Sequence, residues 1–144
     1  MRARTIDKVY FLAYYKRARE FSNAMYDEAV LERYNASALL GIHATIALID
    51  SLLLYESGRR SAEEGHSPAV TLLTRVCAAK KLKDISGTKR FSEIISRKNH
   101  IAYSEHYRAD CFDLSNEIRM NVERCFNWAY RNFESWNKET ERAA

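Results

Sequence analysis

The segment from Asn35 to Ser57 constrains the fold more than any other part of the chain. Its apolar residues recur at intervals of three and four positions, and further apolar residues flank that stripe on both sides. A helix that is apolar nearly all round has to be covered by other elements, so it belongs at the centre of a bundle. Gly58 follows directly, at the position where such a helix is expected to end.

The rest of the chain favours further helices. It contains one proline and four glycines in 144 residues, too few for the many tight turns of a sandwich or barrel. Helical periodicity predicts four more helices, with Lys81–Arg90 as a basic connection. Their expected ranges run from after Thr5 to Arg33, from Pro68 to about Lys80, from about Phe91 to about Ser104, and from Asp110 to about Lys138. The sequence therefore predicts an all-α fold, a compact up-down bundle of about five helices.

One domain is expected to occupy residues 1–144, because this length is ordinary for a single domain with its own core. The predicted core covers about 5–136, and the polar tail after Lys138 is expected to fray. The first residues contain no apolar signal segment, and we found no run of eighteen apolar residues. A cytoplasmic protein without a membrane segment is the resulting expectation.

Positive charge is concentrated in one sixth of the sequence. Residues 75–98 contain eight basic and two acidic residues, whereas the whole chain contains 23 basic and 19 acidic residues. The eight basic residues are Arg75, Lys80, Lys81, Lys83, Lys89, Arg90, Arg97 and Lys98. Such a local excess can attract phosphate groups, although a solvated basic loop would show the same composition.

Two polar residues interrupt the apolar stripe of the central helix. His43 and Asp50 are seven residues apart, which places them two turns apart on one face. A buried carboxylate is destabilising unless it is paired. Lys98 is a candidate partner for Asp50, because it falls on the apolar stripe of the predicted helix that begins at about Phe91. Three interpretations stay open: a buried ion pair, a polar pocket facing a ligand, or a Lys98 side chain that reaches solvent.

Other kinds of site have no support in the sequence. The histidines and acidic residues lack metal-ligand spacing, and the glycines are too far apart for a phosphate-binding loop. Cys77, Cys111 and Cys125 show no CxxC spacing and are expected to be small buried hydrophobes in a reducing compartment. The aromatic residues of the first helix are expected in the core or in an interface. No metal and no cofactor are predicted.

The order of these features resembles the HEPN superfamily (higher eukaryotes and prokaryotes nucleotide-binding domains) over about Thr5 to Trp136. The resemblance rests on the YNASALL start of the central helix, its HATIALIDSLLLYESG continuation, and a loop histidine, His66, before AVTLL. The segment RKNHIAYSE (Arg97 to Glu105) and a long closing helix ending FNWAYRNF complete it.

Active HEPN proteins are metal-independent endoribonucleases with an arginine, a polar residue and a histidine near the end of the fourth helix. The resemblance puts Lys98, Asn99 and Tyr103 at these positions, with Arg97 and His100 beside them. Lysine retains the positive charge without the bidentate fork of arginine, and tyrosine is a poor general base at neutral pH. His100 or His106 could substitute as the base.

The leading hypothesis is therefore a HEPN-like homodimer that binds RNA, a nucleotide or a partner protein, with little or no nuclease activity. The resemblance also implies a toxin–antitoxin or defence setting, with an antitoxin or nucleotidyltransferase-like partner. The binding residues expected are Asp50, Arg97, His100, His43, Lys89 and Arg90. The alternatives are a metal-independent ribonuclease and a structural or assembly protein.

Overall fold

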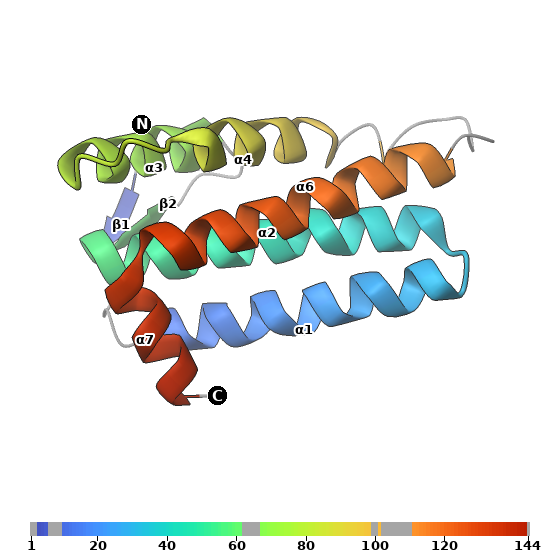
Figure 1. The fold of residues 1–144 in the computed structure, drawn as a ribbon, viewed down its shortest axis with the longest axis horizontal. Coiled ribbons are helices and arrows are strands. Elements are labelled where there is room, and N and C mark those ends of the chain that lie inside the picture. Colours follow the sequence, from blue (N-terminus) through green and yellow to red (C-terminus); the bar gives the residue numbers. More distant parts are fainter. Residues whose placement is uncertain (1–2, 6–9, 62–66, 99–100, 102–110, 144) are drawn as a thin grey trace.

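The computed structural model describes residues 3–5, 10–61, 67–98, 101 and 111–143. Within these ranges the chain is an all-α bundle with one short pair of strands, as Figure 1 shows. The predicted fold class is confirmed, and the described part contains six helices where about five were expected. They are α1 (Phe11–Val30), α2 (Tyr34–Ser57), α3 (Ser67–Ala79), α4 (Ser86–Ser96), α6 (Cys111–Asn132) and α7 (Glu134–Ala143).

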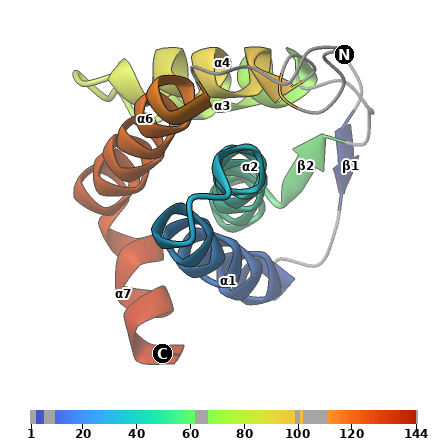
Figure 2. The same ribbon diagram turned by 90° about the vertical axis from the view of Figure 1, so that its right-hand side faces the viewer.

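Helix α2 lies at the centre of the bundle, as its sequence predicts. In the end-on view of Figure 2, α1 lies on one side of α2, α3 and α4 lie on the other, and α6 closes a third side. Its length and apolarity would suit a membrane span, yet 72% of its most apolar window is buried inside the bundle. The other helices cover the surface that a bilayer would otherwise have to cover.

Small residues let the neighbouring helices approach α2 closely. A Cβ atom on Gly41 would lie 2.7 Å from Met25 Sδ of α1 and 3.2 Å from Val122 Cγ2 of α6. Ser37 is fully buried between the same helices, and its hydroxyl donates to the carbonyl of Met25 at 2.7 Å. Close packing and satisfied polar groups therefore occur together along α2.

The start of α4 differs from the prediction. The segment 81–90 was expected to be a connection, but α4 begins at Ser86 and includes Gly87. A Cβ atom at Gly87 would lie 2.0 Å from Trp128 Cδ2, so the glycine provides room for the indole of α6. The glycine that suggested a loop serves a tertiary contact instead. After Ser96, Arg97 forms a turn, and the N–H of Ile101 donates to the Arg97 carbonyl at 3.0 Å.

The single closing helix that was predicted is two helices. The chain leaves α6 at Phe133, and α7 turns away across the end of α1 (Figure 1). This turn brings the fully buried Trp136 against Tyr15, with ring centroids 5.6 Å apart. The expected fraying after Lys138 is wrong, because the chain is helical to Ala143 and Thr140 is buried.

A pair of short strands was not predicted. Strand β1 (Ala3–Thr5) runs antiparallel to β2 (Arg59–Ser61), with Ala3 opposite Ser61 and Thr5 opposite Arg59. The helix expected to begin after Thr5 therefore begins only at Phe11. Three-residue strands paired by backbone hydrogen bonds leave little signal in side-chain periodicity, which is why the pattern did not reveal them.

Candidate functional site

Two of the predicted site residues, His43 and Lys98, are coupled electrostatically in the structure. His43 is half-buried in the middle of α2, with its ring centroid 6.0 Å from that of Phe21. Burial lowers the pKa of His43 below its usual value of 6.5, and the positive charge of Lys98 lowers it further. The imidazole is therefore neutral at physiological pH and lies within electrostatic reach of a cation.

Asp50 lies two turns further along α2. Its side chain is half-buried and interacts with another group. The predicted pairing of Asp50 with Lys98 stays a prediction, whereas the charge of Lys98 lowers the pKa of His43. Lys98 is half-buried, just after the turn at Arg97.

Arg97 lies at the edge of a polar hollow between α4 and α6. Its guanidinium is 3.4 Å from the carboxylate of Glu117, and both side chains are about half exposed. An exposed pair of this kind contributes at most about 1 kcal/mol to folding. The hollow measures about 530 Å³, and its lining includes Glu93, Ser96 and Asn121. Arg97 is thus held by one weak, exposed ion pair.

The remaining motif residues fall outside the described residues. This applies to Asn99, His100 and Tyr103, and also to His106. The geometry of the predicted catalytic arrangement therefore stays a prediction. Only Lys98, at its first position, is described.

A surface rich in lysine and arginine covers α3, the following connection and the start of α4. We call it the basic ridge and define it by four exposed side chains: Arg75, Lys81, Lys83 and Lys89. None of the four forms an ion pair with another described residue, whereas Lys80 nearby is 3.3 Å from Glu56. Helices α3 and α4 lie on the same side of the bundle (Figure 2), so the elements that carry these charges share that side.

Arg90 differs from the basic ridge because it is half-buried and lies beside Cys125 of α6. Burial raises the pKa of the Cys125 thiol to about 12, and the charge of Arg90 opposes this rise. The pKa of Cys77 is also raised by burial. Both cysteines are free and buried, as predicted, and are not nucleophiles at neutral pH. Among the described residues, no three His, Cys, Asp or Glu side chains gather as a metal site would require.

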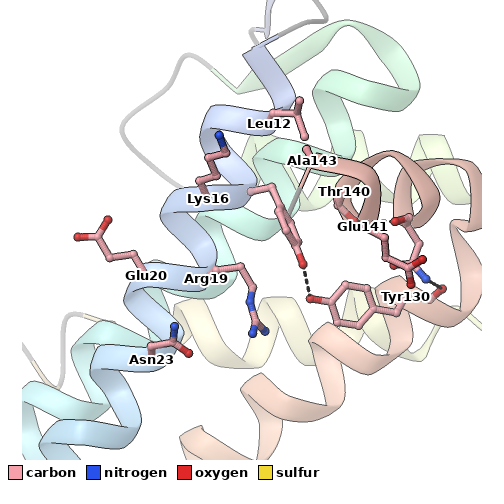
Figure 3. Close-up of a pocket in the computed structure, with 11 residues that line it drawn as sticks. Leu12, Lys16, Arg19, Glu20, Asn23, Tyr130, Thr140, Glu141 and Ala143 are labelled. Atoms are coloured by element: carbon pink, nitrogen blue, oxygen red, sulfur yellow. Dashed lines mark hydrogen bonds between the residues drawn. The ribbon is translucent and has the colours of Figure 1, made fainter.

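Sequence reasoning missed a larger hollow on another face of the molecule. A groove of about 820 Å³ lies between α1, the end of α6 and α7 (Figure 3). Tyr15 of α1 and Tyr130 of α6 meet in it, with their hydroxyl oxygens 2.9 Å apart. These two residues are 115 positions apart in sequence, and no spacing rule connects them. The only signal was the richness of α1 in tyrosine, which was interpreted as core or interface.

Comparison with known proteins adds no relative. No protein family, no curated protein and no solved structure matches the chain. Its function therefore has to be inferred from its own residues.

Proposed function

We propose that this chain is a HEPN-like RNA-binding protein with little or no nuclease activity. The observation that carries the proposal is the basic ridge, whose four cations have no ionic partner among the described residues. Phosphate groups of a nucleic acid would supply the missing negative charge, with release of counterions.

The distribution of charge supports this proposal. Residues 75–98 have an excess of six basic residues, whereas the whole chain has an excess of four. The remainder of the chain is therefore net acidic, with two more acidic than basic residues. A polyanion would be attracted to the α3–α4 face and repelled, on average, elsewhere.

The proposed absence of strong cleavage rests on the motif residues. Lys98 can neutralise a phosphate oxygen but cannot hold two oxygens in the planar fork of an arginine. Tyr103 stands at the position of the general base, and a phenol is a poor proton acceptor at neutral pH. As part of the proposal, two copies form a homodimer in a toxin–antitoxin or defence setting.

Binding of a fluorescent single-stranded RNA at several salt concentrations tests the proposal. The affinity should weaken as salt rises, by about 0.7 in its logarithm per logarithmic unit of salt for each phosphate contact. Replacing Lys83 and Lys89 with glutamate should remove most of the binding and flatten this slope by about 1.4.

The control replaces Arg124 and Lys138, two exposed cations outside the ridge, with glutamate. This variant has the same net charge as the ridge variant and should lose much less affinity. Equal losses in both variants, or no RNA binding at low salt, would contradict the proposal and favour the assembly hypothesis. Light scattering that gives the mass of one copy at tens of micromolar protein would exclude the homodimer.

One observation favours the ribonuclease alternative. A neutral imidazole at His43 can accept a proton, and Lys98 lies close enough to lower its pKa. Incubation with labelled RNA in EDTA separates the two functions. Cleavage that is lost in both His43→Gln and Lys98→Gln would establish the metal-independent ribonuclease, whereas intact RNA agrees with binding alone.

A further inference from the structure

The groove between α1, α6 and α7 has the size of a small-molecule site. Its volume of about 820 Å³ lies within the range of about 300–1,000 Å³ that is typical of ligand pockets. A second hollow of about 400 Å³ continues from it along α1 and α6. Arg19, Asn23 and Tyr130 line both hollows, so the two form one groove with these residues at the junction.

One wall of the groove is aromatic, and the buried Trp136 behind it holds its rings in place. The ring of Tyr130 stacks on Trp136 at a centroid distance of 5.7 Å and an interplanar angle of 23°, and Tyr15 meets the same indole edge-on. The indole N–H of the fully buried Trp136 donates to Ser51 Oγ at 3.0 Å. The wall is therefore preorganised and apolar, and its two tyrosine rings are steeply inclined to each other.

The charge in the groove is positive where the two hollows meet. The guanidinium of Arg19 points from α1 towards Tyr130 (Figure 3) and forms no ion pair within the described part of the chain. Burial raises the pKa of Tyr130, and the hydrogen bond between its hydroxyl and that of Tyr15 raises it further, so this phenol stays neutral and gives no counter-charge. The carboxylate of Glu123 nearby accepts a hydrogen bond from Tyr26.

Two carboxylates also line the larger hollow. Glu20 points away from the groove in Figure 3, on the far side of α1 from Tyr130. Glu141 lines the groove from α7, opposite α1. A ligand would therefore meet Arg19 at the junction of the hollows, Glu141 on the α7 side and Glu123 in the smaller hollow.

We propose that this groove binds a small organic carboxylate with a flat apolar body. Its carboxylate would accept hydrogen bonds from Arg19, which can donate two in parallel, and its body would stack on the ring of Tyr130 and meet that of Tyr15 edge-on. Helices α1 and α7, which line the groove, lie on the opposite side of the bundle from α3 and α4, which carry the basic ridge (Figure 2), so this proposal does not rest on the proposed RNA binding.

Calorimetric titration of the full chain with naphthoate and with its neutral counterpart naphthamide tests the charge requirement. Naphthoate should bind, and naphthamide should bind at least about tenfold more weakly, since a hydrogen bond to a charged group contributes about 1.5–3 kcal/mol. Amide chemical-shift changes caused by naphthoate should fall on α1 and α7. Equal affinities, or shifts confined to α3 and α4, would overturn the proposal.

Two substitutions with opposite expected effects test the site itself. Arg19→Gln should weaken naphthoate binding about tenfold or more, whereas Glu141→Gln should tighten it by removing a repulsive charge. Arg17→Gln is the matched control, because Arg17 is exposed on the same helix, lies 5.0 Å from the Tyr14 ring and does not line the groove. A loss in Arg17→Gln equal to that in Arg19→Gln, or a loss in Glu141→Gln, would overturn the assignment. RNA binding should be the same in all three variants, so failure of one proposal leaves the other intact.

Discussion

The two faces of the bundle are attached to the core by different physical means. On the α3–α4 face, α4 is held against α6 by shape, because Trp128 lies on the bare backbone of Gly87. The indole N–H of Trp128 also donates to the carbonyl of Asp84, just before α4, at 2.9 Å. On the α1–α7 face, Ser51 of α2 links both helices through hydrogen bonds: it donates to the carbonyl of Phe11 at 2.8 Å and accepts from Trp136.

The comparison teaches where each face is vulnerable. A contact that depends on shape fails when a single carbon is added, because a packed core has no space to receive it. A buried polar link fails when one member is removed, because its partners are left without hydrogen bonds. The surfaces of the two faces also differ: the first has cations without an ionic partner among the described residues, and the second has tyrosines that are hydrogen-bonded to each other.

The largest effect is expected from Gly87→Ala. The new Cβ would lie 2.0 Å from the indole of the fully buried Trp128, so either the ring or α4 must move. We expect a loss of about 3 kcal/mol or more in the free energy of unfolding, measured by urea denaturation. Ser92→Ala, on the exposed side of α4, should be nearly neutral. Combining Gly87→Ala with Trp128→Leu should recover part of what Gly87→Ala loses, since the bulk at the contact is removed. Full stability of Gly87→Ala alone would show that shape does not hold this face.

The next effect tests the polar link on the other face. Ser51→Ala removes the acceptor of the Trp136 N–H and the donor to the Phe11 carbonyl, both in the buried core. The expected loss is about 2 kcal/mol in the free energy of unfolding. Thr74→Ala is the control, because the Thr74 hydroxyl also donates to a backbone carbonyl, that of Val70 at 2.9 Å, but is exposed. Similar losses in both variants would mean that burial does not matter to this link.

A smaller, stabilising effect is expected at one helix end on each face. Glu32 and Lys81 follow α1 and α3 with φ of 60° and 56°, a left-handed conformation that suits glycine better. After α3, the N–H of Leu82 donates to the Cys77 carbonyl and that of Lys81 to the Ala78 carbonyl, the hydrogen bonds of a Schellman motif. Glu32→Gly and Lys81→Gly should each raise the free energy of unfolding by about 1 kcal/mol.

The same two variants sharpen the functional comparison. Only Lys81 belongs to the basic ridge, so Lys81→Gly should weaken RNA binding while Glu32→Gly should leave it unchanged or slightly stronger. The fluorescence titration described for the ridge variants measures both. An equal effect of the two substitutions on RNA affinity would argue against the α3–α4 face as the binding surface.

The smallest effect concerns His43, which lies on α2 between the two faces. Its pKa is lower in the folded protein than in the unfolded chain, where it is near 6.5. Between these two values the unfolded chain binds more protons, so the free energy of unfolding falls as the pH decreases through this window. Above pH 6.5 the contribution is fully present. NMR titration of the His43 ring should give a value below 6.5, and Lys98→Gln should raise it. An unchanged His43 pKa in Lys98→Gln would show that the charge of Lys98 does not act on His43.

Much of the fold could be predicted from the sequence because buried apolar residues recur with the period of the helix. The apolar stripe and flanks of α2 predicted its central position, and the ends of α2 and α3 were predicted to within one or two residues. Where a residue serves a contact with a distant part of the chain, the prediction failed. Gly87 suggested a connection because its partner, Trp128, is 41 positions away in the sequence. The turn at Phe133 could not be predicted because no proline or glycine marks it.

The same division applies to the sites. The sequence by itself determined the all-α class, the concentration of cations between Arg75 and Lys98, and the polar interruptions of α2, since each is a property of neighbouring residues. Only the tertiary structure decided which of them meet: Lys98 acts on His43, and Tyr15 meets Tyr130 in a groove lined by α1 and α7. Periodicity fixes the face of a helix on which a side chain lies, but the packing of helices fixes what that face contacts.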